Sequence, residues 1–148
     1  MVVTTLKKEA TPLIRYRTGD LTKLIPGQCK CGSLLPRHDR ILGRTDDMII
    51  FRGVNIYPGQ IDYVLSSIDG LGSEYQIYLE RAPDGRDYMN LKVERDQDLD
   101  ASADESLKEK IWTAIKKQIL VSANVDVVDY GTLPRSERKS KRVFDNRE

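Results

Sequence analysis

At 148 residues, the chain is long enough for one domain, or for one domain plus part of another. A formal net charge of +1 argues against general affinity for nucleic acid or an acidic membrane, and no apolar run approaches the ~18 residues that cross a bilayer. Because the first residues also lack the pattern of a signal peptide, we expect a cytoplasmic protein.

Short strands are predicted for the first part of the chain. Residues 12–25 are consistent with two strands around a turn at Thr18-Gly19-Asp20, since these residue types favour turns. A further strand is expected over residues 36–42, ending at Gly43.

Cys29 and Cys31 are separated by a single residue. Two thiols do not make a disulfide framework, and a bridge between residues two apart would be strained. A closed zinc site takes four ligands, so Cys29 and Cys31 are at most half of one, even with His38 nearby. A pair of reduced cysteines in a turn is the alternative.

A three-part segment occupies residues 43–58. Residues 43–47 are polar, and residues 48–51 form an apolar run that suits a short buried strand. Arg52-Gly53 interrupts this run at a point where glycine permits a positive φ or the close approach of a ligand. Pro58 suits the first turn of a helix. We therefore expect a polar joint, a tight hairpin and then a helix.

Hydrophobic periodicity predicts the remaining elements. Helices are expected over residues 58–69, closed by Gly70, and from Ser102 onward, where Glu105 completes a capping-box pattern. Trp112 is expected to pack at the edge of the second helix. Strands are expected over residues 75–80, 89–93 and 124–130, with a turn at residues 83–85. This order predicts an α+β fold, a small sandwich with two helices on one face of an antiparallel sheet.

A basic segment closes the chain. Five of the eight residues from Arg135 to Arg142 are basic, which fits a solvated tail or a phosphate-binding patch.

Three stretches of this sequence together resemble one family. Gly-Arg-Thr-Asp-Asp-Met-Ile-Ile-Phe-Arg-Gly-Val-Asn-Ile-Tyr-Pro at residues 43–58 is similar to the hinge and following loop of phenylacetate-coenzyme A ligases, which are adenylate-forming enzymes. Residues 16–20 resemble the family's Tyr-Arg-Thr-Gly-Asp motif, and residues 133–143 resemble its lysine motif. The resemblance covers nearly all of this chain but only the C-terminal part of the family enzyme. It implies that residues 1–43 are the last β-structure of a large adenylation domain and that residues 44–148 are the smaller lid domain.

The resemblance also implies roles for individual residues. Lys139 falls on the adenylation lysine, although Arg138 replaces the usual glycine before it and leaves Lys141 as an alternate. Asp20 matches the ribose ligand, Arg44 a ribose or phosphate contact, Asp46 the hinge, and Gly53 the room for the pantetheine arm of coenzyme A.

The implied reaction joins a small carboxylic acid to coenzyme A through an acyl-adenylate made from ATP. Mg²⁺ would bind through the nucleotide, with its protein ligands in the missing domain, and Zn²⁺ could bind the cysteines. The partners implied are that domain and, through exposed strands in residues 1–43, a second copy of the chain; no membrane or nucleic acid is implied. The phosphate loop and acid pocket are not in this sequence, so we expect the chain by itself to be inactive. A free-standing ligand-binding module and an RNA-binding protein with a basic tail are the alternatives.

Overall fold

The computed structural model describes residues 1–135 and 141–147. These residues divide into two compact units, Met1–Met48 and Ile49–Glu148. The break follows Met48, five residues after Gly43, so the three-residue helix η1 (Thr45–Asp47) belongs with the first unit.

The first unit is built from pairs of two-residue strands. The pairs are β1 (Val2–Val3) with β2 (Tyr16–Arg17), β3 (Asp20–Leu21) with β6 (Gly43–Arg44), and β4 (Leu24–Ile25) with β5 (Arg37–His38). The two strands expected around the turn are β2 and β3, although Asp20 belongs to β3 rather than to the turn. They do not pair with each other, because β2 pairs with β1 and β3 pairs with β6. Large apolar side chains such as Leu6 and Leu34 are exposed, and no residue of this unit belongs to the buried core.

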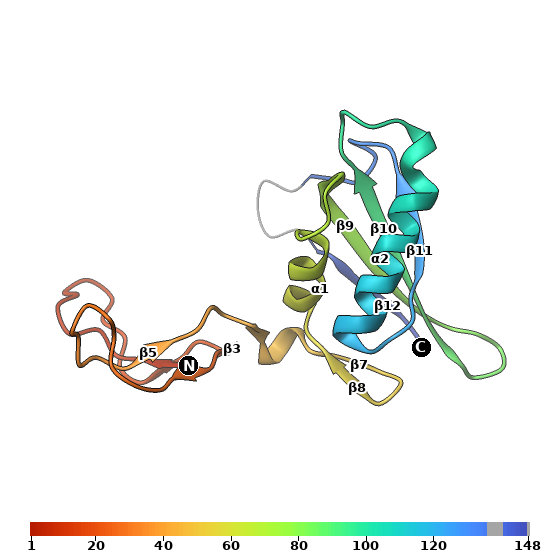
Figure 1. Ribbon diagram of the computed structural model, residues 1–148. Helices are drawn as coiled ribbons and strands as arrows, with labels where there is room; N and C mark the ends of the chain where they lie inside the picture. Colours follow the sequence, from red (N-terminus) through yellow and green to blue (C-terminus); the bar gives the residue numbers. More distant parts are fainter. Residues whose placement is uncertain (136–140, 148) are drawn as a thin grey trace. The chain divides into compact units, whose positions relative to one another are not determined.

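A four-stranded sheet forms the centre of the second unit (Figure 1). Its strands are β9 (Leu71–Arg81), β10 (Asp87–Arg95), β11 (Asn124–Val128) and β12 (Val143–Asn146), in the order β11-β10-β9-β12. The expected turn joins β9 and β10 as an antiparallel pair, but β11 lies parallel to β10 and β12 parallel to β9. The α+β class is confirmed, and the sheet is mixed because long connections precede both edge strands.

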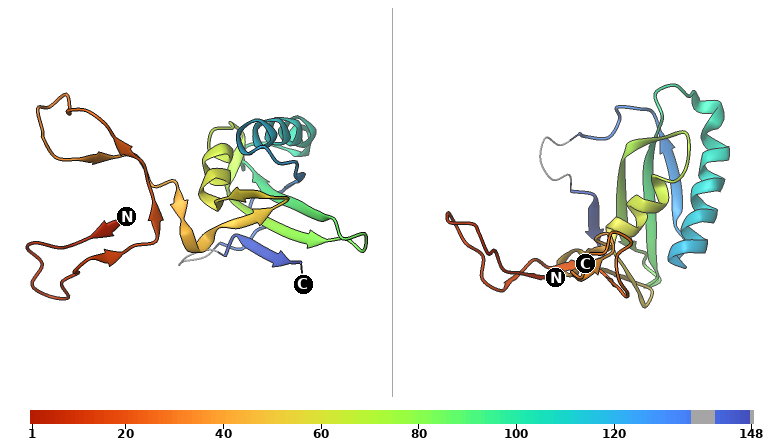
Figure 2. Two further views of the ribbon diagram at one scale, coloured as in Figure 1. Left: turned by 90° about the horizontal axis from the view of Figure 1, so that it is seen from below. Right: turned by 60° about the vertical axis from the view of Figure 1, so that its left-hand side comes forward.

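Two helices cover the same side of this sheet, as Figure 2 shows. They are α1 (Pro58–Leu65) and α2 (Asp104–Ile119). Alternate residues of β9 and β10 face them, and the short strands β7 (Ile49–Phe51) and β8 (Val54–Ile56) also contribute to the core. The most deeply buried apolar side chains include Phe51, Ile56, Ile61, Ile77, Leu79, Leu91, Ile111 and Ile115. No helix of the described residues has both the length and the apolar character needed to cross a membrane.

The helix ends differ from those expected. α1 stops at Leu65 instead of continuing toward Gly70, and the Ser67 hydroxyl donates to the carbonyl oxygen of Val64 at 2.7 Å. Such short polar side chains compete with the helical backbone for hydrogen bonds. At the other helix, the carboxylate of Asp100 accepts from the amide of Ser102 at 2.9 Å, and a 3₁₀ turn, η2 (Ala101–Ala103), precedes α2. The capping box expected from Ser102 is therefore absent.

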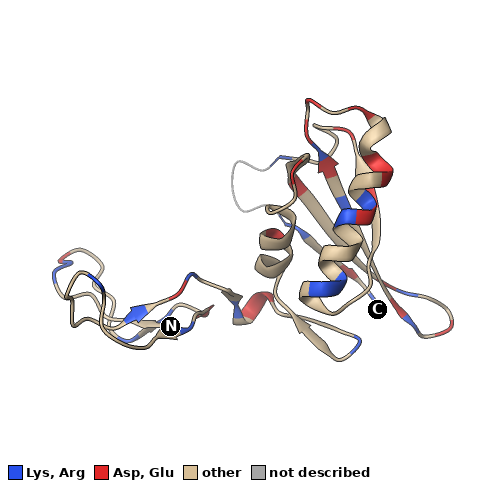
Figure 3. Cartoon of the chain, in the orientation of Figure 1, with Lys and Arg blue, Asp and Glu red and all other residues tan. Residues whose placement is uncertain are grey.

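Trp112 lies at the edge of the buried face of α2, as expected. The residue is 42% exposed, and the Lys116 ammonium lies 4.5 Å from its ring centroid. Acidic residues mark the start of α2 and basic residues its end (Figure 3), which suits the helix dipole.

Candidate functional site

The β7–β8 hairpin turns through two residues with left-handed backbone. The φ angle is 48° at Arg52 and 79° at Gly53, and Phe51 pairs with Val54 across the turn. A side chain at Gly53 would meet no atom within 4 Å, so glycine is needed there for its φ rather than for space. The predicted tight hairpin is confirmed, with Gly53 open at its tip.

The side chain of Arg52 connects this tip to the beginning of β10. Its Nε and Nη2 atoms donate to the carbonyl oxygen of Asp87 at 2.8 and 2.5 Å. The guanidinium carbon also lies 5.2 Å from the centroid of the Phe51 ring and 5.6 Å from that of Tyr88. Backbone hydrogen bonds and aromatic contacts thus hold the cation at the tip.

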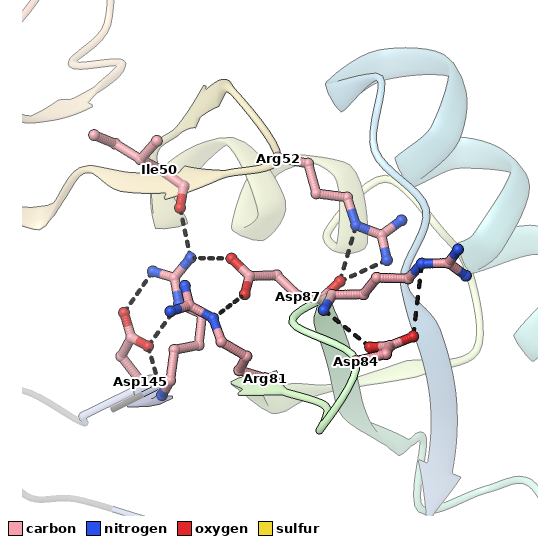
Figure 4. Close-up of polar contacts among 8 residues, drawn as sticks. Ile50, Arg52, Arg81, Asp84, Asp87 and Asp145 are labelled. Carbon is pink, nitrogen blue, oxygen red and sulfur yellow. Dashed lines mark hydrogen bonds and ion pairs between the residues drawn. The ribbon is translucent and has the colours of Figure 1, made fainter.

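The side chain of Asp87 is shared by two arginines (Figure 4). Arg81 Nε lies 2.9 Å from one carboxylate oxygen and Arg147 Nη1 lies 3.1 Å from the other. Hydrogen bonding from Arg81, followed by that from Arg147, lowers the pKa of Asp87 despite some desolvation. The carboxylate is therefore ionised at neutral pH.

Arg147, just after β12, links three parts of the second unit. It pairs with Asp145 at 2.6 Å and donates to the carbonyl oxygen of Ile50 in β7 at 2.7 Å. Hydrogen bonding to Asp145 raises the pKa of Arg147, and the same bond lowers the pKa of Asp145. The hairpin β7–β8, the β9–β10 turn and β12 meet at this side chain.

Two cavities open beside this cluster, with volumes of about 570 and 630 Å³. Arg52, Arg81 and Asp87 line both of them. Arg86 lines the first cavity, whereas Gly53 and Arg147 line the second. Guanidinium groups bind phosphate and carboxylate oxygens through paired hydrogen bonds, so this edge of the unit suits an anionic ligand.

Asp20, Arg44 and Asp46 come together in the first unit. Asp20 pairs with Arg44 across β3 and β6, and their side chains form a 3.3 Å ion pair. Arg44 also binds Asp46 at 2.7 Å, and this hydrogen bond is the main reason that the pKa of Arg44 is raised. Sequence reasoning assigned these three residues separately, and the structure joins them in one network.

The predicted lysine, Lys139, and the residue before it, Arg138, lie outside the described residues. The alternate, Lys141, is described, and its ammonium lies 5.2 Å from the centroid of the Phe144 ring. Phe144 stacks in turn on Tyr78 with 5.0 Å between ring centroids. Lys141 therefore contacts the face of the sheet that the helices leave open.

Cys29 and Cys31 lie side by side with their sulfur atoms 3.1 Å apart. Their hydrogen bond lowers the pKa of the exposed Cys31 thiol. The imidazole of His38 is oriented instead by Thr22 and by the Asp39 carbonyl oxygen. Nowhere in residues 1–135 and 141–147 do three or more His, Cys, Asp or Glu side chains gather as metal ligands would. The two thiols alone do not fit a closed zinc site.

Sequence reasoning missed the arginine and aspartate cluster around Asp87. Arg81 and Asp87 flank the predicted β9–β10 turn, which was the available signal for their ion pair. For Arg147 there was no such signal, because its partners Asp87 and Ile50 are distant in the chain.

The model of the family described as "AMP-binding enzyme C-terminal domain" matches residues 53–147, well over half of the chain. The chain belongs to this family. The match includes the hairpin tip at Gly53, the Asp87 cluster and the segment that carries Lys139. A stand-alone regulatory or RNA-binding module is not favoured.

Three relatives illustrate the similarity. Phenylacetate-coenzyme A ligase of Thermus thermophilus is 43% identical over 99% of this chain, which spans 36% of that enzyme. A crystallised domain of phenylacetate-coenzyme A ligase from Bacteroides vulgatus has a TM-score of 0.62 and 41% identity, covering 70% of this chain and 95% of its own. 2-Hydroxyisobutyryl-CoA ligase, crystallised in postadenylation and thioesterification states, reaches a TM-score of 0.82 at 33% identity in the former, over 99% of this chain and 31% of its own.

The chain thus spans about a third of the length of the curated relatives it matches. The predicted resemblance to phenylacetate-coenzyme A ligases is confirmed for this C-terminal portion.

Proposed function

We propose that this chain is the C-terminal part of an ATP-dependent ligase that joins phenylacetate to coenzyme A. The observation that carries the proposal is the similarity to phenylacetate-coenzyme A ligases along almost the whole chain. The missing partner is a large adenylation domain, which would supply the phosphate loop and the pocket for the acid. Residues 1–48 would complete that domain, and their exposed apolar side chains would be covered by it or by a second copy. We assign the enzyme to the cytoplasm.

In the first half-reaction, the carboxylate attacks the α-phosphate of ATP and releases pyrophosphate. Lys139 would place its ammonium between the carboxylate and the α-phosphate, where negative charge concentrates in the transition state. Asp20 would accept hydrogen bonds from the ribose hydroxyls. Its contact with Arg44 uses Oδ1, so Oδ2 is directed to the ligand in this proposal. Arg44 would hold both Asp20 and the nucleotide.

In the second half-reaction, the thiol of coenzyme A attacks the acyl-adenylate and AMP leaves. Rotation about Asp46 would withdraw Lys139 and bring the β7–β8 hairpin to the site, a hinge motion at an element boundary. The open tip at Gly53 would leave room for the pantetheine arm. The neighbouring guanidinium groups of Arg52, Arg86 and Arg147 would attract the phosphate groups of coenzyme A.

Mg²⁺ would be held by the nucleotide phosphates and by ligands of the large domain, where it would offset phosphate charge. Zn²⁺ binding by Cys29 and Cys31 would need two further ligands from that domain.

Pyrophosphate exchange into ATP, measured with phenylacetate, tests the proposal. The 148-residue chain alone should show no exchange above a buffer blank, because catalysis by positioning needs both parts of the site together. A chimera, in which residues 1–148 replace the segment they match in the Thermus thermophilus enzyme, should exchange and should form phenylacetyl-CoA. A folded chimera without exchange would contradict the proposal, as would exchange by the chain alone.

A further inference from the structure

The carboxylate of Glu94 is fully buried near the end of β10, with 0% of the residue exposed. The register of β9 and β10 shifts between Val93 and Arg95, where a bulge occurs. At this bulge, a Cβ atom on Gly72 would lie only 3.2 Å from the Cβ of Glu94, so the glycine backbone covers the acid closely. A charge taken out of water in this way requires a partner of opposite charge and hydrogen bonds.

The partners of Glu94 come from the beginning of the segment that carries Lys139. One carboxylate oxygen accepts from the amide of Leu133 at 2.7 Å, and the other binds Arg135 Nη2 at 2.9 Å. The guanidinium group of Arg135 also lies 4.4 Å from the centroid of the Tyr130 ring. The two oxygen atoms of one buried carboxylate thus hold residues 133–135 at the end of β10.

A second anchor holds the other end of the segment. Arg142 binds Asp62 of α1 at 2.8 Å, approaches Glu74 at 3.8 Å, and lies 4.4 Å from the ring centroid of Tyr75. Its carbonyl oxygen accepts from the amide of Ile77 at 2.8 Å, directly before the pairing of β12 with β9 begins.

Lys139 stands close in the sequence to both anchors. It follows Arg135 by four residues and precedes Arg142 by three. Because so few residues separate the lysine from each anchor, loss of the contact between Glu94 and Arg135 would release one of the two fixed ends of a short segment.

We propose that Glu94 is a positioning residue for Lys139 in the adenylation half-reaction. This inference rests on the proposed function of Lys139 and adds a requirement for the buried carboxylate. A purely structural role does not require an acid here, because a buried ion pair contributes little net stability compared with a well-packed apolar pair. The role of Glu94 is instead geometric. It fixes one end of a short segment, and the lysine of that segment must be positioned accurately for the transition state.

The test uses the chimera that contains residues 1–148. Glu94→Gln keeps the shape of the side chain and an acceptor for Leu133 but removes the charge that binds Arg135. Pyrophosphate exchange reports adenylation, and thioester formation from preformed phenylacetyl-adenylate reports the second step. Glu94→Gln should slow exchange by about 10- to 100-fold through kcat, the size of effect that a misplaced group produces, and should leave thioester formation nearly unchanged.

A matched control and a second variant separate positioning from folding. Glu80→Gln is the control, because it removes a charge from the neighbouring strand β9. Glu80 is exposed there and accepts a hydrogen bond from Asn90. Neither half-reaction should change in this variant. Arg135→Lys keeps a positive charge for Glu94 but loses the paired guanidinium nitrogens and the contact with Tyr130. It should reproduce the selective loss of adenylation if Glu94→Gln fails to fold.

The outcomes distinguish this inference from the proposed function. Unchanged exchange in Glu94→Gln, or equal slowing of both half-reactions, overturns the positioning role while the ligase function stands. If the unsubstituted chimera is inactive, the proposed function fails. The contact of Glu94 with residues 133–135 is then tested in the 148-residue chain alone. There, Glu94→Ala should remove the protection of the Leu133 amide from hydrogen exchange, and unchanged protection would show that Glu94 does not anchor the segment.

Discussion

Asp87 shows how single residues hold the candidate site together. Its carboxylate binds arginines from β9 and from the residue after β12, while its backbone carbonyl accepts from Arg52 in the hairpin turn. A substitution that removes the carboxylate would therefore break the contacts with β9 and with the residue after β12, while the backbone contact with Arg52 remains. Arg81 would lose this acidic partner beside the cavities, whereas Arg147 would keep its ion pair with Asp145.

The contribution of Asp87 to stability should depend on pH. Hydrogen bonds from Arg81, and then from Arg147, lower the pKa of Asp87 from its ordinary value of 3.8. A lowered pKa means that the ionised side chain stabilises the fold above the unfolded pKa and loses this effect as the pH falls through the folded pKa. Asp87→Asn should therefore reduce the Tm at pH 7 and have a much smaller effect near pH 2.

Thermal unfolding of both proteins between these pH values tests this expectation. Asp126→Asn, at an exposed aspartate of β11, serves as the control and should change the Tm little at either pH. A Tm difference for Asp87→Asn that stays constant from neutral to acid pH would rule out the ion pairs as its cause.

Sequence reasoning found the residues that stand in ordered motifs and missed those joined only by folding. Gly53 was found because a glycine between two short apolar runs has a local physical reason, its positive φ. Asp20, Arg44 and Asp46 were found through the resemblance. Glu94 was not found, because it lies at a bulge opposite Gly72 and its partners, Leu133 and Arg135, are distant in the chain.

At the scale of elements, periodicity predicted where helices and strands occur but not how they begin and end. The apolar spacing of α2 and the alternation along β9 and β10 are set by the face that each element buries. The start of α2 follows a different rule. Asp100, Ser102 and Asp104 are all residue types that can cap a helix, but Asp100 caps the preceding turn η2, and α2 itself begins after Ala103 without a side-chain cap.

Two substitutions test which residue caps η2, the turn that leads into α2. Asp100→Ala loses the acceptor for the Ser102 amide and should lower the Tm by about 5 °C, as loss of an N-cap does in a domain of this size. Ser102→Ala keeps the Asp100 carboxylate in place and should have a smaller effect. A larger loss for Ser102→Ala in thermal unfolding would show that the serine is the true cap.

Two adjacent positions of α2 provide a test of which face is buried. Ile111 is 0% exposed in the core, whereas Trp112 next to it is 42% exposed and contacts Lys116. Ile111→Ala should lower the free energy of unfolding by about 2–5 kcal/mol, because it leaves a cavity. Trp112→Ala should cost at most about 1 kcal/mol, the strength of an exposed cation–π contact. Urea unfolding measures both, and similar costs would contradict the orientation of the helix.

At the scale of the whole molecule, the two units differ in how they are stabilised. The second unit encloses a continuous core between its helices and sheet. The first unit has paired strands and a polar network but exposes its large apolar side chains. This contrast fits a lid domain that folds by itself and a terminal portion that requires the rest of a larger domain. The family resemblance placed a domain boundary after Gly43, whereas the compact units divide after Met48, where no change in composition marks the chain.

If the units alternate between two orientations in the complete enzyme, two substitutions in the chimera should affect different half-reactions. Lys139→Ala should slow pyrophosphate exchange by about 10²–10³-fold, the cost of removing one group that stabilises transition-state charge, and should spare thioester formation from preformed phenylacetyl-adenylate. Asp46→Pro fixes φ at the proposed hinge, so it should block thioester formation and leave exchange largely intact.

Asp46→Ala is the control for the hinge variant, because it removes the same ion pair with Arg44 without fixing φ, and should leave both steps close to normal. Lys141→Ala tests the alternate lysine. If the replacement of glycine by Arg138 has shifted the reactive position, Lys141→Ala rather than Lys139→Ala will lose adenylation. If every lysine and hinge variant slows both half-reactions equally, alternation about Asp46 is not how the proposed ligase separates its two steps.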